Sequence, residues 1–463
     1  MGHAGYRSRP AHAAAGPCSR GAAVSRFGWG EVTGRQWAVL AGATLGYGLY
    51  YVCRLSLAVV KAPLVSTGIL TEAQVGLAGS ALFFTYAAGK FANGILADRV
   101  NLRLLLALGL VGSALVNLAL GWAGGWLIFA GFAALWGLNG WLQSMGASAC
   151  VVGITRWFEP RQRGTCYGLW SASHNIGEAL TFLLTSLVVA TWGWRAGFVA
   201  SATAGAFGVL LIWVLFRHKP LDPNATVAVE AAPVKTLGLL TPDQLRVLRN
   251  PLVWCIASAS AAVYVTRYAV NSWGVFYFHH AKGYTLVEAG SLVAISSVCG
   301  VLGTIASGWL SDVVFLGDRV KPSVLFGILN CASLALMLLV PHGPWILDAL
   351  SMVGFGLSIG SLVCLMGGLM AVDSVPKAAA GTALGLVGVA SYLGAGTQDV
   401  LSGWLIGRGR LGSAGLPAYD FTSVRACWLA AALASVALTL LAWRMQRRRA
   451  RRSLGLEPPL SRR

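Results

Sequence analysis

Gly46-Tyr47-Gly48-Leu49-Tyr50-Tyr51-Val52-Cys53-Arg54 lies inside the first long apolar run of the chain, which extends from Trp37 to Val60. A helix of roughly 20 apolar residues can cross a lipid bilayer, so this run is long enough. Arg54 is therefore expected at membrane depth, where an arginine costs about 2.5–3.5 kcal/mol on an insertion scale. Such a residue needs a binding role or a partner. Snorkelling of the side chain to the interface is the alternative.

A second arginine repeats this pattern in the second half of the chain. Arg267 ends the segment Val263-Tyr264-Val265-Thr266-Arg267 in the seventh apolar run. Each arginine follows a tyrosine, Tyr51 or Tyr264, by three residues, which is about one helical turn. Two intramembrane arginines, one in each half of the chain, predict a central site for an anion.

The composition of the 463-residue chain is that of a polytopic membrane protein. It is 56% hydrophobic and only 11% charged, whereas ordinary soluble domains are roughly 25% charged. The first run is too long for a cleaved signal peptide and is predicted to be a retained helix. The apolar runs predict an all-α protein with twelve transmembrane helices, at about 37–60, 73–97, 102–120, 126–155, 164–190, 196–216, 252–278, 288–312, 322–340, 344–372, 379–406 and 424–443.

The net charge of +19 could suggest a nucleic-acid partner, but the placement of the charges argues against one. With the N-terminus inside, 26 of the 35 lysines and arginines fall in the tails and inner loops, and 6 fall in the outer loops. The other three, Arg54, Lys90 and Arg267, lie inside predicted helices. This is the positive-inside pattern, and it predicts that both termini are cytoplasmic. The basic C-terminal tail could also touch anionic lipid.

Internal repeats divide the chain into two halves. Gly94-Ile95-Leu96-Ala97-Asp98 returns as Gly308-Trp309-Leu310-Ser311-Asp312, and Gly164-Thr165-Cys166-Tyr167-Gly168-Leu169 returns as Gly381-Thr382-Ala383-Leu384-Gly385-Leu386, each at nearly the offset that separates the two arginines. The predicted organisation is an N-terminal tail (1–36), a six-helix half (37–216), a proline-containing linker (217–250), a second six-helix half (251–443) and a basic tail (444–463). Parallel six-helix repeats resemble the major facilitator fold, with its site between the halves.

Four further ionisable residues inside predicted helices are candidates for the site. Lys90 could meet an anion or a buried carboxylate, or it could snorkel to the interface. His174 and Glu178 are four residues apart and can share a helix face, where a His–Glu pair can hold or pass a proton. A hydrogen-bonded structural histidine is the alternative. Asp399 could pair with a buried cation, or be solvated near a helix end.

The sequence contains no motif that indicates an enzyme, a cofactor or a metal. Its nine cysteines are scattered, without a C-x-x-C pair, and most lie in apolar runs as small core residues. No Walker loop, dinucleotide fingerprint or hydrolase elbow is present. We therefore expect neither catalysis nor a bound cofactor or metal ion.

Motifs along most of the chain resemble the organophosphate:phosphate antiporter family of the major facilitator superfamily. Asp98-Arg99 with Arg103 resembles the loop signature of the superfamily. The family resemblance is carried by Tyr50-Tyr51-Val52-Cys53-Arg54, Gly89-Lys90-Phe91-Ala92-Asn93-Gly94-Ile95-Leu96-Ala97-Asp98-Arg99, Gly137-Leu138-Asn139-Gly140 with Gln143, Arg156-Trp157-Phe158, Ser173-His174-Asn175, Gly193-Trp194-Arg195, Val263-Tyr264-Val265-Thr266-Arg267 with Trp273-Gly274, and Tyr392-Leu393-Gly394-Ala395. That family contains glycerol-phosphate and hexose-phosphate transporters and a hexose-phosphate sensor, and the sensor branch looks nearest.

The resemblance implies a phosphate site between the halves. The family arginines that Arg54 and Arg267 match grip the phosphate, and a guanidinium suits phosphate because it donates two parallel hydrogen bonds. The resemblance adds Tyr47, Tyr51, Tyr86, Lys90, His174 and Tyr264 as residues that line the site.

The chain departs from the family pattern in its ion pairs. In the family a lysine usually stands at the position of Leu55, an aspartate at that of Ser272 and an acid at that of Ser297. A Trp-Pro-Pro segment of the family is replaced near Gly146-Ala147-Ser148, and a family glycine is replaced by Glu178. We therefore expect the phosphate-binding arginines to be kept while the surrounding pairs change, with Glu178 or Asp399 balancing Lys90.

These features together predict a monomeric secondary transporter in a bacterial inner membrane. It would carry a phosphorylated organic anion in exchange for inorganic phosphate, by alternating access, with two arginines clamping the phosphate. Two alternatives stay open. One is a membrane sensor of an extracellular sugar phosphate with a kinase partner, and the other is a proton-coupled organic-anion transporter that uses His174 and Glu178.

Overall fold

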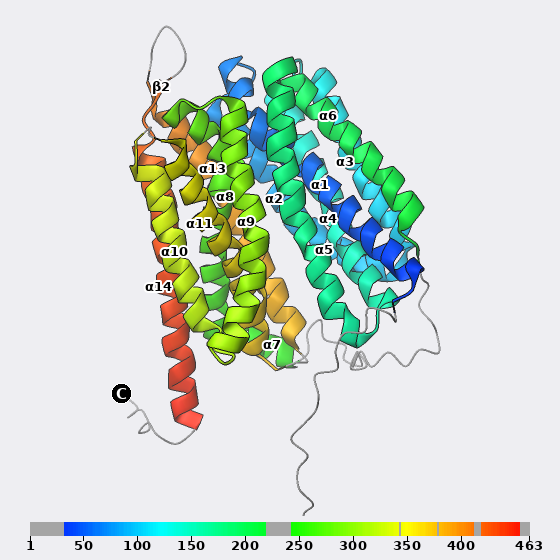
Figure 1. The fold of residues 1–463 in the computed structure, drawn as a ribbon, viewed down its shortest axis with the longest axis vertical. Helices are drawn as coiled ribbons and strands as arrows, with labels where there is room; N and C mark the ends of the chain where they lie inside the picture. The colour runs from blue at the N-terminus through cyan, green and yellow to red at the C-terminus, as the bar shows by residue number, and fades with distance from the viewer. Residues whose placement is uncertain (1–31, 219–241, 342–343, 377–378, 412–417, 454–463) are drawn as a thin grey trace, which may run out of the picture.

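Two bundles of membrane-length helices lie side by side in the computed structural model (Figure 1). The structure describes residues 32–218, 242–341, 344–376, 379–411 and 418–453. Most of the predicted N-terminal tail (1–36) and linker (217–250), and residues 454–463 of the predicted basic tail, therefore lie outside the described residues.

The first bundle is formed by α1 (Gly34–Ser66), α2 (Glu72–Arg99), α3 (Leu102–Ala123), α4 (Phe129–Trp157), α5 (Pro160–Leu180), the π-helical turn η2 (Thr181–Thr185) and α6 (Ser186–Leu215). The short helix α7 (Pro242–Leu248) precedes the second bundle. That bundle contains α8 (Pro251–Lys282), α9 (Leu286–Trp309), η3 (Leu310–Val314), α10 (Val320–Leu339), α11 (Trp345–Cys364), η4 (Leu365–Leu369), α12 (Met370–Asp373), α13 (Ala380–Arg408) and α14 (Thr422–Ser453).

These elements make the twelve membrane crossings that the sequence predicts. Eight helical segments of the described chain are long and apolar enough to span a membrane by length and composition. One of them, Gln162–Leu215, has 54 residues, about 80 Å of helix, and so accounts for two crossings. It is interrupted at Gly193, whose φ of 82° is open to glycine at little cost. The polar or glycine-rich helices α2, α4 and α13 complete the set.

Two helices extend further than the hydropathy predicts, and two lysines change their place as a result. The predicted helices end at 60 and 278, which would put Lys61 and Lys282 in loops, but α1 continues to Ser66 and α8 to Lys282. The two side chains are only 1% and 3% exposed. A lysine ends an apolar run, yet a helix can continue through it when a buried carboxylate compensates its charge.

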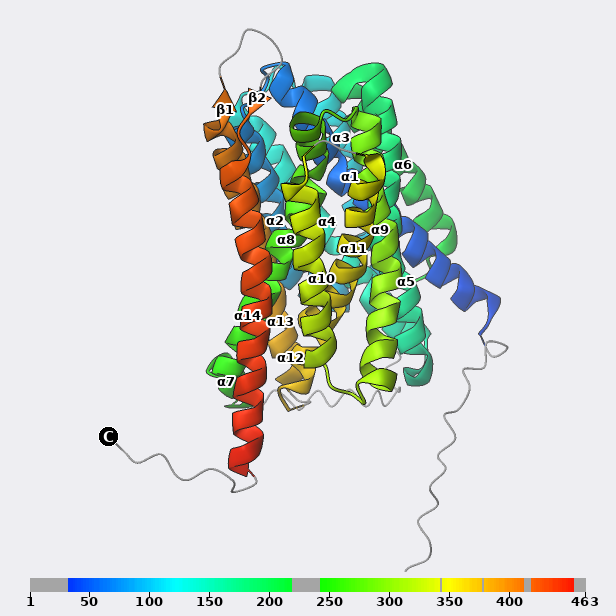
Figure 2. The same ribbon diagram turned by 60° about the vertical axis from the view of Figure 1, so that its left-hand side comes forward.

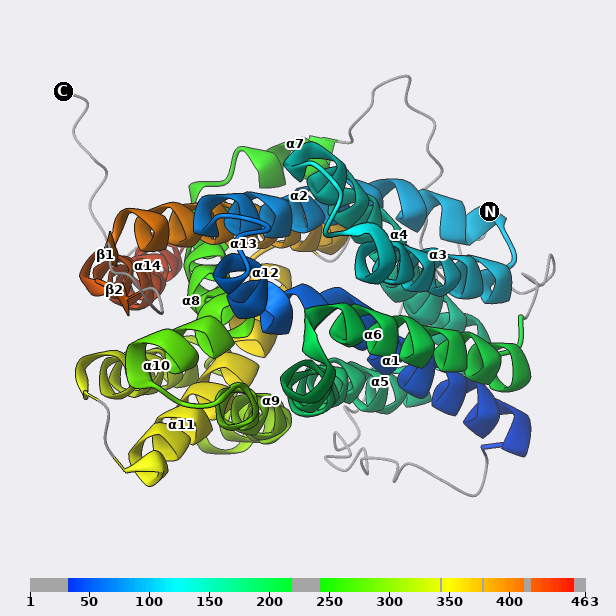
Figure 3. The same ribbon diagram turned by 90° about the horizontal axis from the view of Figure 1, so that it is seen from above.

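The two bundles meet along α2 and α13, α1 and α8, and α5 and α9 (Figure 3). Two glycines of α2 allow a close approach to α13. A Cβ added at Gly79 would collide with Oδ2 of Asp399, and one added at Gly76 would collide with the Asp399 carbonyl oxygen. Only a residue without a side chain fits at either position, as is typical of tightly packed membrane helices.

A short β-hairpin lies at one end of the bundles, which we call the hairpin end (Figure 2). Strands β1 (Arg410–Leu411) and β2 (Ala418–Tyr419) pair antiparallel. Glu72, at the start of α2, accepts hydrogen bonds from Tyr419 Oη at 2.7 Å and Arg410 Nη1 at 3.3 Å, so this end also joins the two bundles. Burial, and then the bond to Glu72, raises the pKa of Tyr419, which keeps its phenol a donor.

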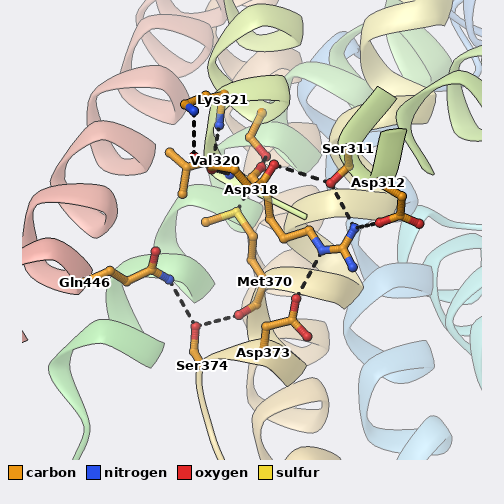
Figure 4. Close-up of polar contacts among 11 residues, drawn as sticks. Ser311, Asp312, Asp318, Val320, Lys321, Met370, Asp373, Ser374 and Gln446 are labelled. Carbon is orange, nitrogen blue, oxygen red and sulfur yellow. Dashed lines mark hydrogen bonds and ion pairs between the residues drawn. The ribbon is translucent and has the colours of Figure 1, made fainter. Parts of the chain in front are cut away.

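The opposite end, where α1 begins and α14 ends, is called the tail end. There the second copy of the Gly-x-x-x-Asp repeat forms a polar network (Figure 4). The Arg319 guanidinium bonds Asp312 at 2.5 Å, Asp373 at 3.1 Å and Ser311 at 2.8 Å, which ties η3, α10 and α12 together. The corresponding side chain of the first copy, Asp98, lies outside the described residues.

Candidate functional site: two buried arginines between the halves

Hydrogen bonds from two neighbouring helices fix the backbone that carries Arg54. The carbonyl oxygen of Cys53 accepts from Asn117 Nδ2 of α3 at 2.9 Å and from Asn139 Nδ2 of α4 at 3.1 Å. Gln143 Nε2 donates to the carbonyl of Tyr50 at 3.0 Å. All three amides are buried. The Gly137–Gln143 motif therefore holds α1 in place one residue before Arg54.

The Arg54 guanidinium lies among aromatic rings and has no acidic partner among the described residues. Its Cζ is 4.2 Å from the ring centroid of Tyr86, 5.4 Å from that of Tyr51 and 5.6 Å from that of Tyr392. These distances are those of cation–π contacts. The side chain is 3% exposed, and its Nε and Nη2 atoms are buried without a hydrogen-bond partner. Buried donors without acceptors are costly, and they mark a place that an anion can fill.

A chain of tyrosine rings connects Arg54 with Arg267. The ring of Tyr392 is 4.7 Å from that of Tyr86 and 5.6 Å from that of Tyr264. The Tyr264 centroid is in turn 5.9 Å from Arg267 Cζ. The predicted pair of arginines thus shares one aromatic cluster between the halves. Lys90 adjoins the same cluster, with Nζ 5.9 Å from the Tyr392 centroid, and its side chain is exposed.

Arg267 differs from Arg54 because it is paired with a carboxylate. Its Nη2 donates to Oε1 of Glu178 at 2.6 Å, and the two side chains are 11% and 3% exposed. Since Glu178 belongs to α5 and Arg267 to α8, this ion pair crosses from one half to the other. The expectation that Glu178 balances Lys90 is therefore wrong, because Arg267 takes the carboxylate.

His174 belongs to a second aromatic group beside Arg54. Its ring lies 5.1 Å from Tyr47, 5.2 Å from Tyr51 and 5.1 Å from Trp170. Nδ1 is 2.5 Å from the carbonyl oxygen of Ser171, so Nδ1 carries the proton in that bond. The sequence spacing predicts a pair between His174 and Glu178. Among the described contacts these two side chains share no hydrogen bond, since Glu178 bonds Arg267.

Asp399 is paired with a lysine that the sequence analysis placed in a loop. Its Oδ1 accepts from Lys61 Nζ at 2.7 Å, from Ser272 Oγ at 2.7 Å and from Trp273 Nε1 at 2.5 Å. Lys61 also bonds Ser272 at 2.6 Å and lies 4.0 Å from the Trp273 ring. Asp399 is fully buried, so the alternative of a solvated carboxylate is wrong. The expectation that Asp399 balances Lys90 is also wrong, because Asp399 is paired with Lys61.

A small cavity separates Arg54 from the Lys61–Asp399 pair. Its volume is about 20 Å³, and its lining includes Arg54, Lys61, Phe83, Ser272 and Asp399. This is room for about one water molecule. A phosphate group cannot enter it without movement of the surrounding side chains, so this conformation is closed on that face of Arg54.

Sequence reasoning missed four residues that shape the site. Tyr392, Tyr268 and Trp170 contact the arginines or the aromatic rings beside them, and Lys61 forms the second buried pair. Signals were present for two of them. Tyr392 lies in a segment that carries the family resemblance, and Tyr268 follows Arg267 directly.

Comparisons with known proteins agree with this architecture. A profile of the Major Facilitator Superfamily matches residues 21–398. The membrane sensor protein UhpC of Salmonella typhimurium is 33% identical over 384 residues, which cover 80% of this chain and 85% of the relative. A probable hexose phosphate transport protein of Chlamydia pneumoniae is 34% identical over 374 residues, covering 76% of this chain and 81% of that one.

The fold matches a solved transporter structure. A bacterial homologue of the human lysosomal transporter Spinster, in an inward-facing and occupied conformation, superimposes with a TM-score of 0.71 at 16% identity. The match covers 89% of this chain and 98% of that one. With its two six-helix halves, its superfamily match and these sensor and transporter relatives, the chain belongs to the organophosphate:phosphate antiporter family of the major facilitator superfamily.

Proposed function

We propose that the chain is a secondary transporter of a phosphorylated organic anion, such as a sugar phosphate or glycerol phosphate, in exchange for inorganic phosphate. The observation that carries the proposal is Arg54, whose Nε and Nη2 donors are buried without partners between the halves. A phosphate dianion supplies the acceptors that these donors lack. The names of the relatives, which include a hexose phosphate transport protein, support the substrate class.

The number of cations and phenol groups around the tyrosine cluster suits a phosphorylated ligand better than a ligand with only a carboxylate. Arg54, Arg267 and Lys90 adjoin one tyrosine cluster, so three cations and several phenol groups can share a phosphate and its organic substituent. His174 with Tyr47 and Tyr51 extends this surface with neutral hydrogen-bonding groups. Substrate held between Arg54 of α1 and Arg267 of α8 would draw the halves together, as alternating access requires.

Orientation is part of the proposal. We propose that the tail end lies in the cytoplasm and the hairpin end outside, which the excess of lysine and arginine in the tails and in the loops on the same side supports. We also propose that one chain suffices for transport, because the site is built from the two halves of a single chain.

Counterflow of phosphate tests this function. Proteoliposomes are loaded with unlabelled phosphate, labelled phosphate is added outside, and the wild type is compared with Arg54→Lys. Lysine keeps the charge but loses the planar pair of donors, so we expect uptake to fall by about two orders of magnitude, equivalent to about 2.7 kcal/mol. Arg195→Lys is the matched control, since Arg195 is exposed beside Trp194.

Inhibition by unlabelled sugar phosphates and glycerol phosphate in the same assay ranks the substrates. Uptake by Arg54→Lys at the wild-type rate would contradict the proposed role of the guanidinium. No uptake by a folded wild type would contradict exchange altogether.

A membrane sensor is the second candidate, favoured by the 33% identity to a protein named as one. The same site would then bind a sugar phosphate without moving it. Thermal stabilisation by hexose phosphates in the absence of counterflow, with a response that depends on a co-expressed kinase, would favour the sensor.

A further inference from the structure

Glu178 is a carboxylate placed inside the anion site. It lies on α5, is 3% exposed and holds Nη2 of Arg267 at 2.6 Å across the interface of the halves. The other buried carboxylate nearby, Asp399, is bonded to Lys61. Glu178 therefore compensates one of the three cations that adjoin the tyrosine cluster, and it does so without substrate.

The charge of the empty site decides whether a carrier can reorient without substrate. Reorientation passes through a closed state, in which water is excluded and an unpaired charge is costly. A carrier whose site arginines are uncompensated passes through the closed state easily only when an anion is bound. It then has to carry an anion in both directions, so exchange is obligatory. A resident carboxylate removes part of this barrier.

Resting on the proposed transport function, we propose that Glu178 is the resident counter-anion of the empty carrier. By neutralising Arg267, it lets the substrate-free protein reorient, so that the chain supports net flux of its phosphorylated substrate in addition to exchange. Obligatory exchange is then not built into this site.

Arg267 keeps the capacity to bind substrate while Glu178 holds it. A guanidinium has five N–H donors, and the Glu178 contact uses one nitrogen, Nη2. Among the described contacts no other hydrogen bond is made by Arg267. A phosphate can therefore share the guanidinium with Glu178, and the counter-anion does not have to leave the site.

The ratio of exchange to net efflux tests the proposal. Proteoliposomes loaded with labelled phosphate are diluted into medium with or without unlabelled phosphate, and the two efflux rates are compared. For the wild type we expect phosphate outside to accelerate efflux by less than about threefold. Glu178→Gln keeps the size of the side chain and an acceptor oxygen but removes the charge. We expect the acceleration by outside phosphate to be at least about tenfold larger than in the wild type, because a tenfold slower reorientation of the empty carrier corresponds to a barrier increase of about 1.4 kcal/mol.

Asp348→Asn is the matched control. Asp348 is a buried carboxylate bonded to Lys282 and Tyr284, but all three residues belong to the second half and lie outside the tyrosine cluster. Its replacement should leave the efflux ratio at the wild-type value. A change equal to that of Glu178→Gln would mean that loss of any buried pair has this effect, and would overturn the proposal.

The outcomes distinguish failure of the proposed transport function from failure of the proposed role of Glu178. Absence of Arg54-dependent phosphate flux in either medium removes the proposed function, and this inference with it. Flux with a wild-type ratio above about threefold, or with equal ratios in the wild type and Glu178→Gln, overturns the inference alone. If Glu178→Gln does not fold, the wild-type ratio decides.

Discussion

The two buried arginines occupy equivalent positions in the two halves, yet they are held in opposite ways. Around Arg54 the backbone is fixed by buried amides from α3 and α4, and the guanidinium keeps two donors without partners. Around Arg267 the side chain itself is fixed, by an ion pair with Glu178 of the other half. The repeated arginine therefore has unpaired donors in the first half, at Arg54, and a charge neutralised by Glu178 in the second half, at Arg267.

Under the proposed function, this difference gives the two arginines separate tasks. The Arg54 guanidinium suits anion recognition, because its Nε and Nη2 donors have no hydrogen-bond partner among the described residues and a phosphate can accept from both. A guanidinium paired across the interface suits conformational coupling, because the pair links α5 to α8 and changes when an anion shares it. The following measurements are ordered by the size of the expected effect.

Stability should separate the arginines most clearly. Arg267→Gln leaves Glu178 buried without its counter-charge, and we expect the free energy of unfolding to fall by about 3–5 kcal/mol. Arg54→Gln removes a charge that has no acidic partner among the described residues, so we expect little change or a small gain. Thermal or denaturant unfolding of the two variants in detergent measures both values.

Adding Glu178→Gln to Arg267→Gln should restore most of the lost stability, because the double variant removes both charges of this ion pair. If Arg54→Gln is as destabilised as Arg267→Gln, the two sites do not differ in the way described here.

A variant of the Lys61–Asp399 pair shows whether loss of any ion pair between the halves weakens phosphate binding, or only loss of a pair in the site. Lys61→Met leaves Asp399 buried without a cation, and we expect a loss of about 3 kcal/mol in the free energy of unfolding. We expect the phosphate affinity, measured by binding in detergent, to change by less than about threefold, because the pair is outside the tyrosine cluster. An affinity loss as large as that of an arginine variant would place Lys61 in the site.

Tyr392 offers the smallest and most local test, since its ring lies between the arginines. Tyr392→Phe keeps the ring contacts with Tyr86 and Tyr264 and removes one hydroxyl. We expect the affinity for phosphate to fall about two- to tenfold, as loss of one hydrogen bond of about 0.5–1.5 kcal/mol gives. Tyr277→Phe is the control, because Tyr277 bonds the Leu338 carbonyl outside the cluster. Equal effects of the two variants would remove Tyr392 from the site.

Much of the fold follows from patterns that are local in the sequence. Apolar runs predict the twelve crossings, and the repeated landmarks predict two similar halves. The repeat contains one further signal. Asn117 and Asn330 have the same separation in the sequence as the two arginines, and they bond Cys53 and Thr266, the residues that directly precede those arginines. The amide positions could have been predicted from the repeat.

The sequence by itself determined the topology, the two halves and the intramembrane arginines, because hydropathy and charge act within one helix. Tertiary structure alone decided the ion pairs. Glu178 reaches Arg267 over 89 residues of chain, and Lys61 reaches Asp399 over 338. Such pairs depend on the rotation and tilt of helices from different halves, which hydropathy does not encode. The relative rotation of these helices decides which carboxylate meets which cation. The sequence therefore predicts Lys90 as the partner of Glu178 or Asp399, whereas the structure pairs Glu178 with Arg267 and Asp399 with Lys61.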